Sequence, residues 1–218
     1  MLQSDGTIVR YKLVQRIGHW LNALAFLALL LTGFFLFFWP LSPLASFPSR
    51  IIHRLAAIVL LLGPVLYFLT DRQDLVHLLK ASFTYTRDDL IWFIKAPFYF
   101  FGLAKGLPPQ GDINAGQRVH HALTIIFYNL IAWSGFVMWF GAGQIPGQAF
   151  LGALVVHDVS MVVLTVLMVG HVYFTFVYGA LDGMIYGTIT RLYAQVEHPR
   201  WLRELEAAAA QKHGRSNS

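Results

Sequence analysis

Four apolar segments, each long enough to cross a lipid bilayer, constrain this chain more than any other feature. They occupy residues 19–39, 51–70, 119–140 and 151–178. A membrane-spanning helix needs about 20 predominantly apolar residues, and in lipid it must satisfy its own backbone hydrogen bonds. Of the 218 residues 56% are hydrophobic and only 12% are charged, against about 25% charged in soluble domains. The sequence therefore predicts an all-α integral membrane protein, a four-helix bundle forming a single membrane domain over residues 1–218.

Basic residues gather on one side of these segments. Three Lys or Arg precede the first segment, six lie between the second and third, and five follow the fourth, so fourteen of the sixteen share one side. The exceptions are Arg50 and Arg54. Because Lys and Arg concentrate in cytoplasmic loops, both termini are predicted to be cytoplasmic. The net charge of +5 thus reports membrane orientation, and we expect lipid rather than nucleic acid as a partner.

The cytoplasmic parts contain helix signals of their own. In the loop over residues 71–118, the stretch "TRDDLIWFIKAPFYFFGLAKG" opens with a Thr-x-x-Asp pattern that resembles a capping box. Its aromatic residues, interrupted by Pro97, favour one or two helices lying along the inner membrane interface, with a packed loop as the alternative. In the tail, residues 179–218, Pro199 stands before an Ala-rich run and predicts an added cytoplasmic helix.

Four histidines lie near the ends of the apolar segments and sort by depth into two pairs. His53 and His157 share the outer half of the membrane, and His19 and His171 share the inner half. Ionisable groups inside a bilayer are costly and usually mark function. Fourteen residues of helix return to within about 40° of a whole number of turns and rise about 21 Å, so His157 and His171 face nearly the same side.

Two facing imidazoles at each of two levels suit two bis-histidine b haems, each clamped by one histidine above and one below its plane. Ordinary interhelical hydrogen bonding and zinc binding are the alternatives, and His120 or His121 could complete an inner metal cluster with His19 and His171. The absence of cysteine excludes iron–sulfur ligation and covalent c-type haem. The glycines that could admit a flat macrocycle, or simply pack helices, are Gly18, Gly33, Gly63, Gly135 and Gly170.

From residue 15 to about 208 the chain resembles the gamma subunit of respiratory formate dehydrogenase, a four-helix di-haem cytochrome b. The shared motifs are "RIGHW" at the start of the first segment, a histidine early in the second, "NAGQ" at 114–117, two histidines fourteen apart in the fourth, and "HPRWLRELEAA" after it. Cytochrome b subunits of quinone-linked hydrogenases and thiosulfate reductases share this scaffold. The resemblance therefore implies the fold more securely than the substrate of the parent complex.

The resemblance implies a role for each of these residues. It assigns His53 and His157 to the outer haem and His19 and His171 to the inner haem, which is the pairing that depth alone gives. It places quinone at Asn114, Gly116 and Gln117, with His171 close by, and without it Asn114 would be interpreted only as a helix cap. Arg54 is a candidate propionate partner or a snorkelling arginine. His120 and His121 depart from the family pattern and could shuttle protons, contact a propionate or compete as ligands.

These features predict an electron-transfer and quinone-reducing subunit rather than a self-sufficient enzyme, in the inner membrane of a bacterium. The expected partners are an iron–sulfur subunit on the outer side, a catalytic dehydrogenase subunit, and menaquinone or ubiquinone as acceptor. The alternatives are the cytochrome b subunit of another quinone-linked complex, such as a hydrogenase or thiosulfate reductase, and a non-redox membrane anchor or metal transporter.

Reporter fusions test the predicted orientation. We expect a fluorescent protein fused to either terminus to fluoresce, because the positive-inside rule places both ends in the cytoplasm. Alkaline phosphatase inserted in the uncharged loop at 142–146 should be active, because that loop is predicted to lie outside. Phosphatase activity at the C-terminus would reverse the orientation and the sides assigned to both histidine pairs.

Overall fold

The computed structural model describes residues 6–39, 47–103 and 105–216, and it is mostly helical. The chain divides into two compact units. The first comprises residues 13–75 and 123–178 and contains the membrane helices. The second comprises the N-terminal residues up to 12, residues 76–122 and the chain from 179 onward.

The prediction of four membrane-spanning helices is confirmed. The long helices are α1 (Leu13–Phe38), α2 (Phe47–Thr70), α5 (Ala115–Gly141) and α6 (Gly147–Val177), and all four are long and apolar enough to cross a membrane. Each begins four to six residues before its predicted start and ends within one residue of its predicted end. The early starts have a common cause: the first turns carry polar residues such as Arg16, Arg50 and Arg118, which a hydropathy scan rejects but a helix accepts.

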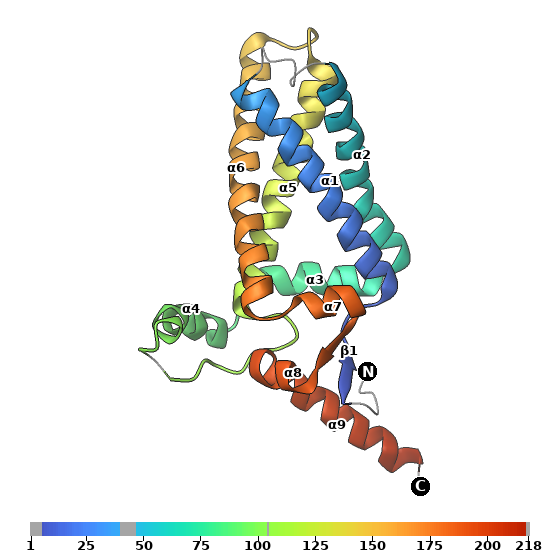
Figure 1. Ribbon diagram of the computed structural model, residues 1–218, viewed down its shortest axis with the longest axis vertical. Coiled ribbons are helices and arrows are strands. Elements are labelled where there is room, and N and C mark those ends of the chain that lie inside the picture. The colour runs from blue at the N-terminus through green and yellow to red at the C-terminus, as the bar shows by residue number, and fades with distance from the viewer. Residues whose placement is uncertain (1–5, 40–46, 104, 217–218) are drawn as a thin grey trace. The chain divides into compact units, whose positions relative to one another are not determined.

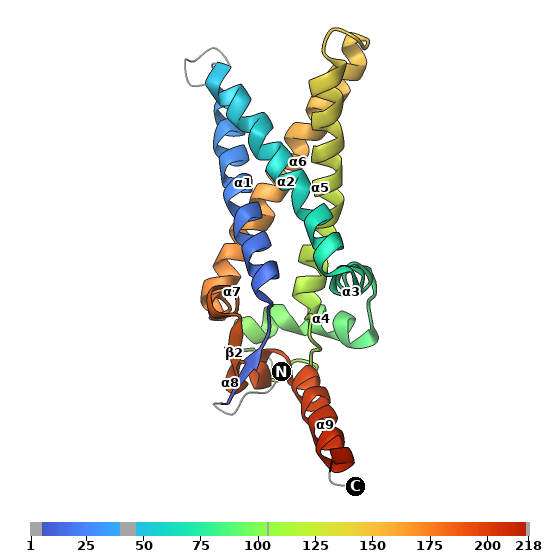
Figure 2. The same ribbon diagram turned by 90° about the vertical axis from the view of Figure 1, so that its right-hand side faces the viewer.

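The membrane helices form two antiparallel pairs, α1 with α2 and α5 with α6 (Figure 2). The α1–α2 packing depends on close contact, because a Cβ on Gly63 would lie 2.3 Å from the side-chain oxygen of Asn22. Helix α5 is joined to α2 where the Tyr128 hydroxyl donates to the carbonyl of Leu60 at 3.0 Å. Small residues and interhelical hydrogen bonds are the contacts that hold helices together where lipid removes the hydrophobic driving force.

In the second unit, a short strand pair joins the two ends of the chain. Strand β1 (Thr7–Val9) pairs antiparallel with β2 (Thr188–Thr190), with Ile8 opposite Ile189. Helix α7 (Leu181–Tyr186) precedes β2, and α8 (Arg191–Glu197) and α9 (Pro199–Ser216) follow it (Figure 1). The buried core of this unit consists of Ile8, Ile189, Ala194 and Leu202. Helix α9 confirms the helix predicted from Pro199, whereas the strands add a feature that the sequence analysis lacked.

The capping box predicted at Thr86 is confirmed. Helix α4 (Arg87–Phe100) begins with Thr86 as its N-cap, and the Asp89 carboxylate accepts from the Thr86 backbone N–H at 2.7 Å. Pro97 lies in its last turn without dividing it. Asp89 is fully buried and lies 3.7 Å from the guanidinium of Arg118, which also donates to the carbonyl of Thr84 at 2.6 Å. Arg118 thus ties the end of α3 (Arg72–Phe83) to the starts of α4 and α5.

The "HPRW" segment holds the chain just before α5. His198 is 1% exposed, and its Nδ1 lies 2.7 Å from the carbonyl oxygen of Gly111. The Arg200 N–H donates to the carbonyl of Gln110 at 3.0 Å, and the Gln110 side chain accepts from the Ala115 N–H at 2.7 Å. Two sequence motifs some 80 residues apart, "NAGQ" and "HPRW", are therefore physically connected through Gln110 and Gly111.

Burial, reinforced by nearby Arg10, lowers the pKa of His198 from 6.5 to about 4, so the ring stays neutral in the folded unit. In the unfolded chain the His198 ring is protonated below pH 6.5, whereas in the folded unit it is protonated only below about pH 4. Stability is therefore complete above pH 6.5 and falls across this window, by about 3 kcal/mol in total.

We expect hydrogen exchange of amides around β1, β2 and α8, corrected for intrinsic rates, to show this loss between pH 7 and pH 4.5. The matched variant is His198→Asn, which retains a donor for the Gly111 carbonyl but cannot titrate. Its opening free energy should be lower at neutral pH, because ring volume is lost, and nearly flat across the same range. Identical pH slopes in both proteins would show that His198 is not the group that titrates.

Candidate functional site

Helix α6 carries one histidine of each predicted pair. It is continuous over 31 residues, from Gly147 to Val177. His157 and His171 therefore differ by about 21 Å along its axis and face nearly the same side. Because one uninterrupted helix holds both side chains, their separation is set by helix geometry rather than by a loop.

Both pairs predicted from the sequence are formed in the membrane unit. The rings of His53 on α2 and His157 on α6 have centroids 6.3 Å apart, with planes at 54°. The rings of His19 on α1 and His171 on α6 have centroids 6.1 Å apart, with planes at 58°. Each pair joins two different helices, which is what two axial ligands of one haem require.

The ring spacing fits a six-coordinate iron between each pair. A metal–imidazole nitrogen bond is about 2.0 Å. The ring nitrogen lies about 1.1 Å from the centre of a five-membered ring built from bonds near 1.33 Å. Two imidazoles in line on opposite faces of one metal therefore have centroids about 6.2 Å apart. The observed 6.1 and 6.3 Å both match this value.

Hydroxyl groups on neighbouring helices contact the His53–His157 pair. Thr32 Oγ1 lies 2.8 Å from Nδ1 of His53, and Ser134 Oγ lies 3.2 Å from Nδ1 of His157. The residue after each hydroxyl is a glycine: a Cβ on Gly33 would lie 3.5 Å from His53 Cε1, and a Cβ on Gly135 would lie 3.2 Å from His157 Cε1. Gly135 therefore makes room for the His157 ring, whereas a Cβ at Gly33 would make an ordinary van der Waals contact with His53. For Gly18 and Gly170, beside His19 and His171, no described atom lies within 4 Å of the Cβ position.

Arg54 stacks on an aromatic ring. Its guanidinium carbon lies 5.1 Å from the centre of the Trp139 ring on α5. A cation over the face of an indole is a favourable contact worth about 0.5–1 kcal/mol at exposed sites. The role of Arg54 at a haem propionate stays a prediction.

His120 and His121 are neighbours near the start of α5, with ring centroids 6.0 Å apart in an edge-to-face arrangement. Over residues 6–39, 47–103 and 105–216, no group of three or more His, Cys, Asp or Glu side chains could hold a metal ion. The zinc alternative therefore gains no support from the described part of the chain.

The amides of "NAGQ" cap α5 reciprocally. The Gln117 N–H donates to Asn114 Oδ1 at 2.8 Å, and the Asn114 N–H donates to Gln117 Oε1 at 2.9 Å. Gly116 lies against Trp92, because a Cβ there would be 3.2 Å from the Trp92 ring. The cap role considered for Asn114 is thus present. Both capping bonds use side-chain oxygens, so the NH₂ groups are the donors that remain for a ligand.

The sequence did not predict two hydrogen-bonded groups. One is the Thr32 and Ser134 pair, whose only sequence signal is a hydroxyl residue preceding glycine in an apolar helix. The other joins the start of α1 to the turn between α2 and α3: Gln15 donates to Asp74, and the Tyr67 hydroxyl donates to the same carboxylate at 3.2 Å. Gln15 also lies 3.5 Å from Asp71, a buried carboxylate. Sequence offers no signal that these four residues converge.

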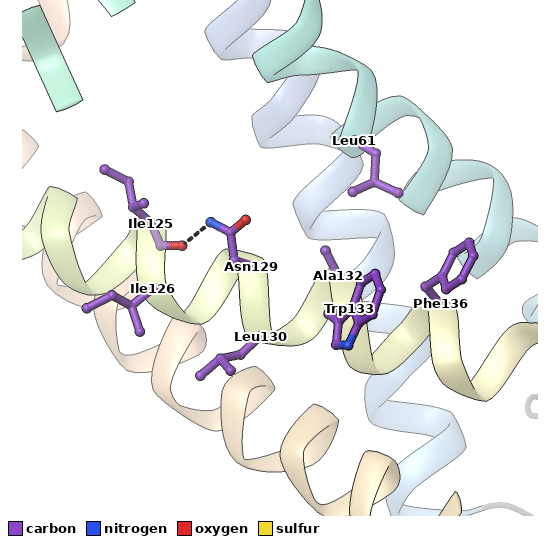
Figure 3. Close-up of a pocket in the computed structure, with 8 residues that line it drawn as sticks. All are labelled: Leu61, Ile125, Ile126, Asn129, Leu130, Ala132, Trp133 and Phe136. Atoms are coloured by element: carbon purple, nitrogen blue, oxygen red, sulfur yellow. Dashed lines mark hydrogen bonds between the residues drawn. The ribbon is translucent and has the colours of Figure 1, made fainter. Parts of the chain in front are cut away.

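An open groove of about 730 Å³ lies along α5 (Figure 3). One residue comes from α2 and seven from α5, and they are Leu61, Ile125, Ile126, Asn129, Leu130, Ala132, Trp133 and Phe136. Asn129 donates to the carbonyl of Ile125 at 2.7 Å, and the Trp133 side chain is 70% exposed. None of the four paired histidines lines this groove, so it is a surface feature of the bundle rather than part of the histidine sites.

Four apolar helices that bring histidines together in facing pairs define a membrane cytochrome of the b type. The chain belongs to the prokaryotic cytochrome b561 family, which matches residues 10–187. Membership implies that the protein binds b-type haem, and together with the four spanning helices it makes the chain a multi-pass membrane protein.

Curated relatives are similar over nearly their whole length. The formate dehydrogenase cytochrome b556(fdo) subunit of Escherichia coli strain K12 is 30% identical over 97% of this chain and 99% of its own. The nitrate-inducible formate dehydrogenase cytochrome b556(Fdn) subunit of the same strain is 28% identical over 97% of both. The formate dehydrogenase cytochrome b556 subunit of Haemophilus influenzae is 25% identical over 93% of this chain and 85% of its own. The resemblance noted from the motifs is confirmed.

Single-ligand variants test the pairing. We expect His157→Ala and His171→Ala each to reduce haem content from two per chain to one, because each removes one axial ligand. Haem extraction and low-temperature difference spectra measure this, and His77→Ala, which alters a histidine paired with Asp112 instead, is the control. Two low-spin haems retained in His171→Ala would identify His120 or His121 as the ligand in its place.

Proposed function

We propose that this chain is the di-haem cytochrome b subunit of a respiratory formate dehydrogenase in the bacterial inner membrane. It accepts electrons from an iron–sulfur subunit on the outer side and delivers them to menaquinone or ubiquinone on the cytoplasmic side. The observation that carries the proposal is the pair of facing histidines at each of two levels of α6, both with the ring spacing that a six-coordinate iron requires. Similarity to formate dehydrogenase cytochrome subunits over 97% of the chain supports the choice of complex.

Bound haem supplies one-electron transfer, which the side chains of this cysteine-free chain do not provide. His53 and His157 would hold the outer group, and His19 and His171 would hold the inner one. Because α6 contributes to both sites, it keeps them at a constant separation along the membrane normal. An apolar membrane environment would exclude water and lower the local dielectric constant around such groups, which is one of the ways a protein adjusts haem potential.

The proposed direction of transfer follows from the distribution of basic residues. With fourteen of sixteen Lys and Arg on the cytoplasmic side, the His53–His157 pair lies toward the outside and the His19–His171 pair toward the inside. Electrons moving inward carry negative charge across the membrane, and quinone reduction takes protons from the cytoplasm. Both movements contribute to the membrane potential.

The proposed quinone-binding groups are Asn114, Gly116 and Gln117 at the start of α5. Quinone reduction consumes two electrons and two protons, so the site needs hydrogen-bond donors for the carbonyl oxygens. The capping oxygens of both amides are engaged with the backbone, which orients the NH₂ groups and fixes them as donors. The absence of a side chain at Gly116 lets Trp92 lie against the backbone there.

Copurification and formate reduction test the function. We expect the native complex to contain an iron–sulfur subunit and a dehydrogenase subunit, and formate to reduce both haems. A protein that folds but binds no haem would contradict the proposal. Haems reduced by hydrogen or another donor, with formate inactive, would assign the chain to a different quinone-linked complex.

Quinone reoxidation of the formate-reduced complex tests the amide groups. Asn114→Asp and Gln117→Glu keep the oxygens that cap α5 but remove the NH₂ donors. Loss of one hydrogen bond to a buried ligand predicts reoxidation about two- to tenfold slower, with both haems retained. Thr190→Ala, which removes the N-cap of α8, is the matched control for a lost cap and should reoxidise normally. If both acid variants are reoxidised by quinone at the wild-type rate, the "NAGQ" amides only cap α5 and do not bind quinone.

A further inference from the structure

Two hydroxyl residues are buried in helices that otherwise expose most of their side chains. Thr32 on α1 is 7% exposed and Ser134 on α5 is 3% exposed. Their neighbours Leu31, Trp133 and Phe136 are between 53% and 70% exposed. Burial of a polar group is costly unless it is hydrogen-bonded, so the partners of these two hydroxyls decide what they do.

Each hydroxyl donates its only proton to its own helix. The Thr32 hydroxyl lies 2.7 Å from the carbonyl of Ala28, and the Ser134 hydroxyl lies 2.7 Å from the carbonyl of Leu130, both one turn earlier. A hydroxyl has one proton and two lone pairs. With the proton committed to the backbone, the oxygen can only accept a second hydrogen bond.

The acceptor oxygens determine the tautomer of the two rings. His53 Nδ1 lies 2.8 Å from the Thr32 oxygen and His157 Nδ1 lies 3.2 Å from the Ser134 oxygen, so in both rings Nδ1–H is the donor. A neutral imidazole carries one N–H, which leaves the lone pair on Nε2. Nε2 is then the nitrogen available to a metal in both rings of the pair.

The same local arrangement occurs twice, on different helices. In Thr32–Gly33 the hydroxyl contacts His53, and in Ser134–Gly135 the hydroxyl contacts His157 while the glycine leaves room for its ring. Helix α1 provides the contact for α2, and α5 provides it for α6. Both ligands of one haem are therefore supported by a hydroxyl–glycine dipeptide from the neighbouring helix.

We propose that Thr32 and Ser134 are positioning residues that set the ligand orientation and the reduction potential of the haem held by His53 and His157. This rests on the proposed function, because it takes that pair to be a haem site. A ligating imidazole whose Nδ1–H donates a hydrogen bond is a stronger base toward iron. A more basic ligand stabilises the ferric state over the ferrous state and lowers the potential of this haem.

Redox titration of the purified complex tests the proposal. Thr32→Val and Ser134→Ala should each shift the midpoint potential of this haem upward while both haems remain bound. We expect the reduced-to-oxidised ratio at the wild-type midpoint to rise about two- to tenfold. A tenfold rise corresponds to about 59 mV for one electron.

Three variants separate positioning from packing. Thr32→Ser and Ser134→Thr keep the hydroxyl and should keep the wild-type potential. Thr165→Val removes a hydroxyl that donates to the Met161 carbonyl on α6 and should change neither haem. The haem that is lost in His157→Ala identifies which potential to follow, and electron paramagnetic resonance of the ferric state reports the ligand orientation.

The outcomes are distinguishable. An upward shift in the midpoint potential of this haem alone supports the proposal if the hydroxyl-retaining variants keep the wild-type potential. Loss of this haem alone in Thr32→Val, with its retention in Thr32→Ser, also supports it. Two haems with unchanged potentials in Thr32→Val and Ser134→Ala would overturn it and leave the proposed function intact. A shift in the other haem would overturn it as well. Wild-type protein without haem would overturn the proposed function first.

Discussion

An imidazole inside a bilayer must find a partner, and the geometry of one helix decides where the partners of His157 and His171 can be. Because fourteen residues of α helix complete nearly whole turns, both side chains leave α6 on the same side at two levels. The remaining helices must then bring His53 to one level and His19 to the other. Helix α1 meets this requirement by placing His19 beside His171, and α2 meets it by placing His53 beside His157.

Outside the histidine pairs, the second unit depends on a different kind of contact. Backbone carbonyls of residues 110 and 111 are held by the segment that begins at His198, and the start of α5 is held in turn by the Gln110 side chain. The buried, neutral His198 is a structural residue, and its motif is one of those on which the family resemblance rests. "HPRW" thus contributes to the capped start of α5, and the two motifs form one structural element.

Much of the fold and the main candidate residues could be predicted from sequence, because their signals are local. Apolar length predicts the four spans, Thr86 and Asp89 predict a capped helix, and the spacing of His157 and His171 predicts two levels. The contacts of Thr32 and Ser134 could not be predicted, because a hydroxyl in an apolar helix most often bonds only to its own backbone. Pairing of Ile8 with Ile189 joins residues at opposite ends of the chain, and three-residue strands carry too short a pattern to recognise.

That strand pair has a consequence for synthesis. Strand β1 is translated before all four membrane helices, yet its partner β2 begins at Thr188, after the last residue of α6. Every membrane helix must therefore be translated before the first strand can pair, and the core around Ile8 cannot form earlier. Strand β1 is thus made before the membrane helices and can pair only after them.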